Sequence, residues 1–277
     1  MMKKRAIITS ALPYANGEIH LGHVASTYLP ADVTTRYLKQ KGVEAYYICA
    51  SDDFGTPILL QSEKLGKTPQ EYVAHWNTRD YDDFTAFNIG FDFFYKTSSQ
   101  ENIDFVQDVF TKLYNSGHIY ESEITQFYCK NDKKFLPDRY VKGTCPYCNA
   151  EDQYSDLCES CGKVPEEIAN PKCSICGASP VKEKTKHYFF KLKTFSDQLY
   201  KWLDENSNLQ KDVKKYVQNW IKTGLVDWDI TRDISWGVKI PLEEANGKVF
   251  YGWFDNHLAY ISTAIKFLND KGIDGKE

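Results

Sequence analysis

The sequence lacks several features that would assign it to common classes of protein. It has no run of 18 apolar residues, and its start, MMKKRAIITSALPY, is charged and has no cleavage site. Neither a membrane-spanning helix nor a secretory signal peptide is therefore predicted. It has no excess of positive charge either: a net charge of −4 argues against strong nonspecific binding of nucleic acid. No Gly-x-Gly-x-x-Gly follows the first strand, which gives a dinucleotide site little support.

Composition and cysteine spacing indicate a soluble protein of a reducing compartment. The chain has 277 residues, of which 42% are hydrophobic and 15% aromatic, enough to bury a full core and to form two domains. Six of the eight cysteines lie in three Cys-x-x-Cys pairs. This spacing favours metal binding over disulfides, so we predict a cytoplasmic protein.

Residues up to 117 alternate between strand and helix patterns. We predict a strand over 5–12, a helix over about 22–41 and a buried strand over 43–50. The segment Thr68-Pro-Gln-Glu71 has the sequence of a capping box and opens a further helix, and another helix starts near Ser98–Glu101 and stops at Gly117. Such alternation predicts an α/β fold with a parallel sheet, in which ligands bind at the carboxyl ends of strands.

The segment ALPYANGEIHLGH, residues 11–23, lies at such a strand end. It leads into a helix whose first turn carries His20, Gly22 and His23. Free amides at a helix start attract phosphate, two imidazoles add donors, and glycine permits close approach of a ligand. Taken alone, two histidines near a helix start are more often a surface pair.

This segment resembles the first signature, the HIGH motif, of class I aminoacyl-tRNA synthetases, in the form seen in methionyl-tRNA synthetases. Three further segments resemble the same family: ICASDDFGTP, DWDITRDISWGVKIP at 227–241 and VFYGWFDNHLAYIS at 249–262. The resemblance extends over essentially the whole chain. It implies a Rossmann-like nucleotide-binding fold interrupted by a small insertion. It also implies activation of methionine with Mg²⁺-bound ATP to methionyl-adenylate, followed by transfer to tRNA(Met).

The resemblance also implies roles for particular residues. Catalytic roles fall to His20, His23 and Arg232, and ATP binding falls to His20, Gly22 and His23. Methionine binding falls to five residues: Leu12, Tyr14, Asp52, Trp253 and Tyr260. Asp52 is the expected partner of the substrate ammonium, although either Asp52 or its neighbour Asp53 is also suited to cap the next helix. The family's WxDAPIGY reads WFDNHLAY at 253–260, so the shape of the thioether pocket and any role of His257 stay open.

Between residues 119 and 186 the chain holds seven of its eight cysteines among short β-like pieces. Two pairs nine residues apart, Cys145/Cys148 and Cys158/Cys161, have the spacing of a closed structural Zn²⁺ site. A second zinc site needs partners for the third pair, Cys173 and Cys176, and the position of Cys129 and Asp132 resembles the start of the zinc module in two-zinc family members. Ligation by Asp132, ligation by water and an empty, degenerate site are all open. Cys49, on the buried strand, is expected to be a core residue.

Helical spacing returns at 194–203 and 209–223. The second helix carries five apolar residues on one face: Val213, Tyr216, Val217, Trp220 and Ile221. We expect three parts: the first half of the catalytic fold at 1–117, a connective insertion at 118–226 and the start of the second half at 227–277.

Two family features are missing from the sequence: the lysine loop KMSKS and a helical anticodon-reading domain. We therefore expect an N-terminal fragment that binds methionine but activates it weakly or not at all, and that contacts tRNA mainly through domains outside the chain.

Two alternatives stay open. One is another class I synthetase, for leucine, isoleucine, valine or cysteine, although the branched-chain enzymes carry a large editing insertion in place of a compact zinc module. The other is a noncatalytic zinc-ribbon module on a nucleotide-binding fold. Stabilisation of the chain by methionine but not by leucine distinguishes a methionyl-tRNA synthetase from both alternatives.

Overall fold

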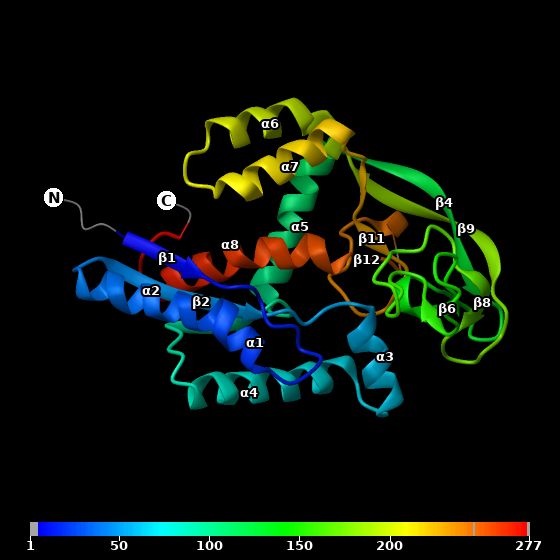
Figure 1. Cartoon of the computed structure of the whole chain (residues 1–277), viewed down its shortest axis with the longest axis horizontal. Helices are drawn as coiled ribbons and strands as arrows, with labels where there is room; N and C mark the ends of the chain where they lie inside the picture. The colour runs from blue at the N-terminus through cyan, green and yellow to red at the C-terminus, as the bar shows by residue number, and fades with distance from the viewer. Residues whose placement is uncertain (1–4, 246, 276–277) are drawn as a thin grey trace.

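The fold is built on a parallel sheet, seen in a computed structural model that describes residues 5–245 and 247–275 (Figure 1). The charged N-terminal residues 1–4 and the terminal residues 276–277 lie outside the described residues. The sheet has the order β1-β2-β3, and both pairings are parallel. Its strands are β1 (Arg5–Thr9), β2 (Glu44–Ser51) and β3 (Phe93–Lys96). The predicted α/β class is confirmed, and β1 ends three residues earlier than predicted.

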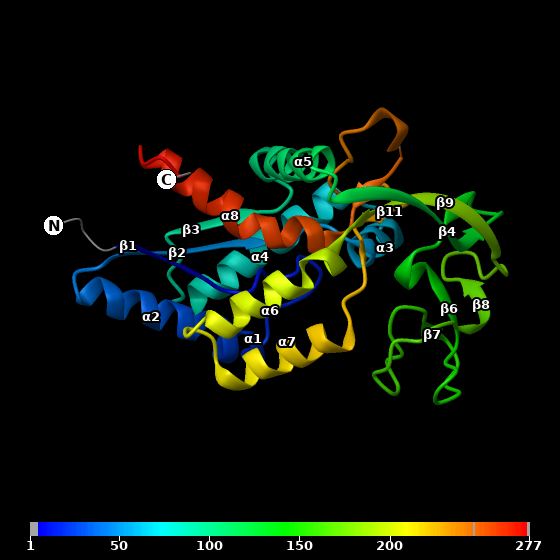
Figure 2. The same cartoon turned by 90° about the horizontal axis from the view of Figure 1, so that it is seen from above.

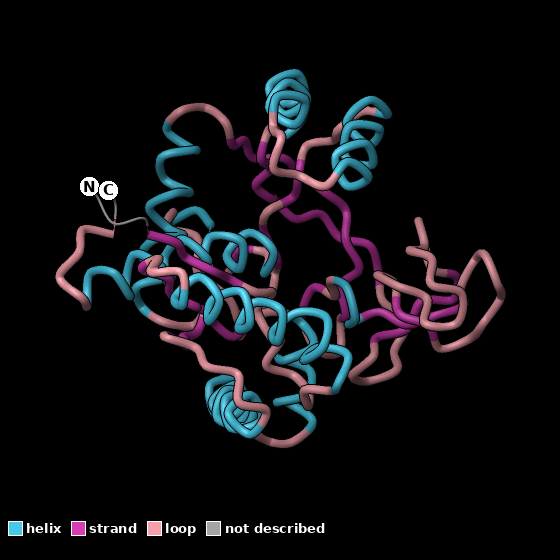
Figure 3. The backbone as a smooth tube through the Cα atoms, turned by 60° about the vertical axis from the view of Figure 1, so that its left-hand side comes forward, coloured by secondary structure: helices cyan, strands magenta, loops and turns pink. Residues whose placement is uncertain are grey.

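Helices cover both faces of this sheet, because the side chains of β2 alternate between them. Tyr47 shares a core cluster with Phe84, whereas the ring of Tyr46 lies 5.0 Å from that of Phe267. The helices that flank the sheet, visible on its two sides in Figure 3, are α2 (Leu29–Gln40), α4 (Pro69–Ala86), α5 (Gln100–Asn115) and α8 (Gly252–Asp270). A shorter helix, α3 (Thr56–Lys64), follows β2.

The predicted helix ends are confirmed. The Thr68 hydroxyl accepts from the Glu71 amide at 3.2 Å, and the Glu71 carboxylate accepts from the Thr68 amide at 2.9 Å. Ser99 caps α5, and Gly117 has a φ of 73° just beyond the end of that helix.

The helical run after β1 contains an irregularity that the pattern did not show. It begins as α1 (Leu21–His23), passes through a π-helical turn at Val24–Tyr28 and continues as α2. Pro30 lies near the start of α2. Proline has no N–H, and its ring crowds the carbonyl four residues earlier, so a regular α-helical ladder cannot run through this point.

The long strands between α5 and α8 form an arm that extends away from the parallel sheet (Figure 2). Its long antiparallel pair belongs to a sheet of order β10-β9-β4-β5, and a small sheet of order β7-β6-β8 lies at its far end. The strands of the arm are β4 (Ile119–Cys129), β5 (Lys134–Phe135), β6 (Val141–Thr144), β7 (Gln153–Tyr154), β8 (Ala169–Cys173), β9 (Val181–Phe190) and β10 (Trp228–Asp229). A hairpin of β11 (Thr231–Arg232) and β12 (Val249–Phe250) returns the chain to α8.

Two helices, α6 (Ser196–Glu205) and α7 (Lys211–Thr223), pack against each other. Their helical nature was predicted, but the expectation of one apolar face on α7 is only partly met. Val217 and Ile221 pack in the cluster around Leu203, whereas Tyr216 and Trp220 are 74% and 61% exposed. Helix α6 therefore covers only part of the apolar face of α7.

Candidate active site and metal centres

The loop after β1 is fixed to the end of β2 by backbone hydrogen bonds. The Asp52 amide donates to the Pro13 carbonyl at 2.7 Å, and the Ala15 amide donates to the Asp52 carbonyl at 3.0 Å. These bonds form a parallel bridge between Tyr14 and Asp52. Two residues predicted from separate motifs therefore lie side by side at the carboxyl end of the sheet.

Asp52 and Asp53 have different environments. Asp53 is fully buried, and its carboxylate accepts from the hydroxyls of Ser51 and Ser98 and from the Ser98 amide. Asp52 accepts only one side-chain hydrogen bond, from Asn256 Nδ2 at 3.1 Å, and its buried Oδ1 has no partner among residues 5–245 and 247–275. Burial raises the pKa of Asp52 to about 7, against the opposing effect of the Asn256 hydrogen bond.

A cavity of about 480 Å³ opens in front of Asp52. It brings together four of the predicted site residues: Tyr14, Asp52, Arg232 and Trp253. Phe250 and Tyr251 add aromatic wall, and Trp253 is 58% exposed. The cavity thus has carboxylates at Asp52, Asp138 and Asp156, guanidiniums at Arg139 and Arg232, and aromatic sides.

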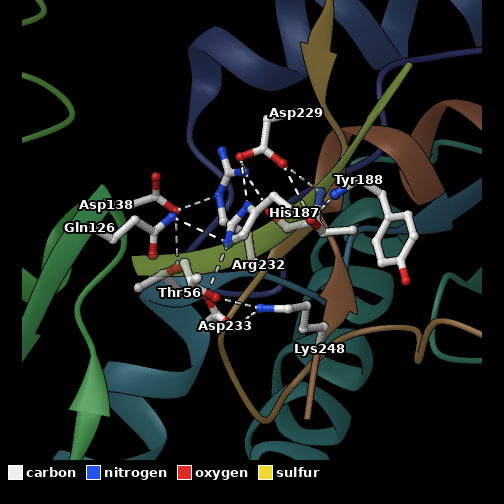
Figure 4. Close-up of polar contacts among 11 residues, drawn as sticks. Thr56, Gln126, Asp138, His187, Tyr188, Asp229, Arg232, Asp233 and Lys248 are labelled. Atoms are coloured by element: carbon white, nitrogen blue, oxygen red, sulfur yellow. Dashed lines mark hydrogen bonds and ion pairs between the residues drawn. The ribbon is translucent and has the colours of Figure 1, made fainter. Parts of the chain in front are cut away.

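Arg232 is held from several directions in this cavity (Figure 4). Its Nε lies 3.3 Å from Asp138 Oδ2, and its Nη1 lies 3.5 Å from Asp229 Oδ2. Its guanidinium also lies 4.0 Å from the centroid of the Tyr251 ring. These contacts fix the plane of the guanidinium on the short strand β11.

The insertion contributes part of the cavity wall, which sequence reasoning missed. Asp138, Arg139 and Asp156 all line it, and Arg139 pairs with Asp156 at 3.6 Å. Asp138 has a φ of 50°, a conformation that costs energy for a residue other than glycine. These residues lie in and after the FLPDRY segment, and nothing in that sequence indicated that its side chains face Arg232.

The two histidines of the first motif cap each other. The His23 amide donates to His20 Nδ1 at 3.3 Å, and the His20 amide donates to His23 Nδ1 at 3.4 Å. Their rings stack with centroids 3.6 Å apart, and burial and the charge of His20 lower the pKa of His23. Because each Nδ1 accepts, each neutral ring carries its proton on Nε2, where it is free to donate.

Gly22 is required by this stacked arrangement, since a Cβ there would lie 2.9 Å from a ring carbon of His20. His23 lines a second cavity, of about 390 Å³, together with Leu12 and Tyr14. His20 and Gly22 lie on the exposed first turn beside it. Tyr14 lines both cavities and so connects the histidines to Asp52.

Leu12 and Tyr260 do not line the Asp52 cavity. They face each other across a crevice that also contains Cys49 and that has no room for a water molecule. The structure therefore brings Tyr14 and Trp253 to the Asp52 cavity, whereas Tyr260 lines the separate crevice. A larger cavity, of about 760 Å³, lies between β5 and the segment before β12. None of the predicted site residues lines it, although Asp233 and Ile234, which follow Arg232 in the chain, do.

Two groups of side chains have the composition and spacing to hold a metal ion. In the first group, Cys145 Sγ lies 3.9 Å from Cys161 Sγ, and Cys148 Sγ lies 3.6 Å from Cys158 Sγ. These separations are too long for a disulfide. They match the distance of about 3.8 Å between two sulfurs that each lie about 2.3 Å from a tetrahedral zinc ion.

The second group consists of Cys129, Asp132, Cys173 and Cys176. Asp132 Oδ2 lies 3.1 Å from the sulfurs of both Cys129 and Cys173. All four knuckles of the two groups end in a residue of positive φ, namely Lys133 (51°), Asn149 (56°), Gly162 (69°) and Gly177 (74°). Asp132 thus occupies the same place in its turn as the second cysteine does in the other three.

Comparison with known proteins assigns the family. A family model described as tRNA synthetases class I (M) matches residues 6–276. The chain belongs to this family. It is 45% identical to the methionine–tRNA ligase of Methanopyrus kandleri over 99% of its own length and 42% of that protein. It is 43% identical to the enzyme of Leptospira biflexa, over 98% of its length and 40% of that protein.

The synthetase fold is shared with solved structures. The chain superposes on Mycobacterium tuberculosis methionyl-tRNA synthetase bound by methionyl-adenylate with a TM-score of 0.70 at 20% identity, covering 95% of this chain and 47% of that one. The chain spans about 40% of the length of the curated synthetases that it matches. In the described part of the chain, none of the helices combines the length and the apolar character needed to cross a bilayer.

Proposed function

We propose that this chain is the part of a methionyl-tRNA synthetase that binds methionine and ATP and joins them as methionyl-adenylate. The observation that carries the proposal is the cavity in front of Asp52. It places the Asp52 carboxylate, which accepts one side-chain hydrogen bond, and the Arg232 guanidinium between aromatic walls. A free amino acid with an apolar side chain has the complementary parts: an ammonium, a carboxylate and an apolar body.

Each residue has a role in this proposal. Asp52 accepts a charge-assisted hydrogen bond from the substrate ammonium, which restores the charged form of a carboxylate whose pKa burial has raised. Arg232 binds the carboxylate or the α-phosphate in two places. Tyr14 and Trp253 contact the side chain, while Leu12 and Tyr260 form the wall behind them, where ring edges suit a thioether.

The chemistry needs no side-chain nucleophile. A methionine carboxylate oxygen attacks the α-phosphorus of ATP, which enters as its Mg²⁺ complex, and pyrophosphate leaves. His20 and His23 donate from Nε2 to the phosphate oxygens as negative charge shifts onto them, and Gly22 leaves room for this approach. The ribose of tRNA(Met) then takes the methionyl group in the whole protein.

We also propose zinc as the metal of both cysteine groups. Four thiolates at Cys145, Cys148, Cys158 and Cys161 form a closed shell, so this ion is structural. The positive φ of Lys133 supports Asp132 as the fourth ligand of the second ion. Reduced thiols of this kind fit a cytoplasmic location. We retain the division into 1–117, 118–226 and 227–277, with the insertion built on β4 and β9.

Metal analysis tests the second ion. The unaltered chain should contain two equivalents of zinc, Asp132→Ala one, and Asp132→Cys two. Lys133→Gly is the matched control: it should retain both ions and raise the stability of the folded protein by about 1 kcal/mol, since glycine adopts a positive φ freely. Two equivalents in Asp132→Ala would show that water or another group completes the site.

Ligand-dependent thermal stability tests the function. Methionine should raise the melting temperature of the chain, and leucine at the same concentration should not. Equal effects of the two amino acids would favour a different class I synthetase. The absence of any effect of methionine, ATP or both together would favour a noncatalytic module.

A further inference from the structure

A buried polar network links the insertion to Arg232 (Figure 4). Its centre is His187 on β9, which is 0% exposed. His187 Nδ1 lies 2.7 Å from Asp229 Oδ2, and Nε2 lies 2.9 Å from Asp233 Oδ2. Figure 4 shows the ring between the two carboxylates.

The partners of this ring define its protonation state. A carboxylate only accepts hydrogen bonds, so each ring nitrogen must carry a proton for both contacts to form. The two contacts form together only when the ring is an imidazolium. Burial lowers the pKa of His187, but hydrogen bonds to Asp229 and Asp233 and their charges raise it by more, so the net direction is upward.

Every other element around the ring is compatible with this charge. From β4, the Gln126 amide nitrogen lies 3.4 Å from Nε2 while Gln126 Oε1 has no partner in the described part of the chain. Turning that amide over presents Oε1 to the ring N–H and satisfies it. On the far side, Lys248 pairs with Asp233, and the Thr185 hydroxyl donates to Asp233 at 3.0 Å.

One atom of the network contacts both His187 and Arg232, which lines the cavity. Asp229 Oδ2, which accepts from His187, also lies 3.5 Å from Arg232 Nη1. The charges balance: three cations, His187, Lys248 and Arg232, face three carboxylates, Asp138, Asp229 and Asp233. Removing the imidazolium charge leaves a net negative charge beside the cavity and leaves Asp229 with the guanidinium as its nearest cation.

We propose that His187 is a positioning residue for Arg232: its imidazolium neutralises the two flanking carboxylates and so leaves the guanidinium available to an anionic group of the ligand. The proposal rests on the proposed binding of methionine at this cavity. If so, His187 on strand β9 of the insertion influences how much positive charge Arg232 offers to a ligand in the cavity.

A pair of ligands isolates this effect. Methionine carries a carboxylate, and methioninol has the same side chain and ammonium but no carboxylate. Calorimetric titration of the chain with each ligand gives the ratio of their affinities. His187→Gln should lower the affinity for methionine by roughly five- to tenfold, a coupling at the low end of the usual range, and leave that for methioninol nearly unchanged. His75→Gln, at an exposed histidine of α4, is the matched control and should change neither.

The pH dependence of the unaltered chain provides the second measurement, which needs no variant to fold. The affinity ratio should be constant while the imidazolium is charged and should fall as the pH rises through its pKa. Titration of Asp52 affects both ligands through the same ammonium and cancels in the ratio. In His187→Gln the ratio should be low and flat.

Nitrogen-15 spectra of the imidazole separate failure of this inference from failure of the proposed function. At pH 7 both ring nitrogens of His187 should be protonated, whether or not methionine binds. A neutral ring would overturn the proposal. If the ring is charged but His187→Gln weakens methionine and methioninol equally, or if the wild-type ratio does not change with pH, His187 has only a structural role and the proposal is wrong. If neither ligand binds a chain with a charged ring, the proposed function fails and the positioning role fails with it.

Discussion

At the scale of single residues, two adjacent aspartates differ in their hydrogen-bond partners. Asp53 makes hydrogen bonds that tie β2 to Ser98 before α5, whereas Asp52 keeps one oxygen without a partner in the described residues. Sequence position placed both at the end of a buried strand, and only the family resemblance favoured Asp52. The contacts now give a physical reason for the same choice.

Substitution of the two aspartates should affect different properties: ligand affinity for Asp52 and protein stability for Asp53. Asp52→Ala should weaken methionine binding by about 10- to 150-fold, the loss of one charge-assisted hydrogen bond, with little change in stability. Asp53→Ala should lower the free energy of unfolding by about 2 to 3 kcal/mol, because the buried hydroxyl of Ser51 and the half-buried hydroxyl of Ser98 lose their acceptor. Calorimetric titration and urea denaturation measure the two effects. Equal losses of affinity at matched stability would mean that Asp52 is not the ammonium partner.

Methionine affinity should also depend on the protonation of Asp52. Its pKa of about 7 in the free protein lies above the ordinary value, so the carboxylate binds a proton as the pH falls below 7. The ammonium requires the ionised form, and binding should therefore weaken below pH 7 by up to about tenfold per pH unit. Titrations between pH 5.5 and 8 test this expectation, with Asp52→Asn as the control in which the dependence should disappear. An affinity that is flat across this range in the unaltered chain would contradict it.

Some site residues could not have been found from sequence. Asp138 lies 94 positions from Arg232, and His187 lies 42 positions from Asp229, yet both pairs are in contact. No local sequence pattern around His187 or Asp138 indicates that it contacts a residue so far along the chain. Their roles depend on how β9, β10 and β11 meet, which only the tertiary structure shows.

At the scale of elements, local signals predicted the helices and the knuckles well. The capping box at Thr68 and the glycine at 117 mark real helix ends, because these motifs satisfy backbone groups locally. The pattern was less informative for α7, where periodicity identified a helix but not which apolar residues are covered. It also missed the π-helical turn before Pro30.

The zinc ion proposed for the first cysteine group is expected to stabilise one wall of the cavity. Cys158→Ala should remove the first metal ion, whose apparent binding energy in comparable sites is on the order of 10 to 16 kcal/mol, and disorder the knuckle. Because Asp138, Arg139 and Asp156 line the cavity, methionine affinity should fall as well. Ser160→Ala, an exposed position between two ligands, is the control and should retain both metal and affinity. Unchanged affinity in a zinc-depleted Cys158→Ala would show that the insertion is not part of the binding site.

At the scale of the whole molecule, the site is assembled from three parts of the chain. The loop after β1 and the end of β2 supply Tyr14 and Asp52, the insertion supplies Asp138, and the segment from β11 to α8 supplies Arg232 and Trp253. Motif resemblance placed the first and third parts at a common site. It treated the insertion as a separate zinc module, and the structure shows that side chains of this module line the cavity.

The most direct test of the account is a crystal structure of the chain with methionine, with an anomalous scan at the zinc edge. The account predicts the methionine ammonium within hydrogen-bonding distance of the Asp52 carboxylate, its carboxylate at Arg232 and its side chain between Tyr14 and Trp253. Anomalous peaks should mark both cysteine groups. Methionine bound elsewhere, or bound here with its carboxylate away from Arg232, would contradict the central claim.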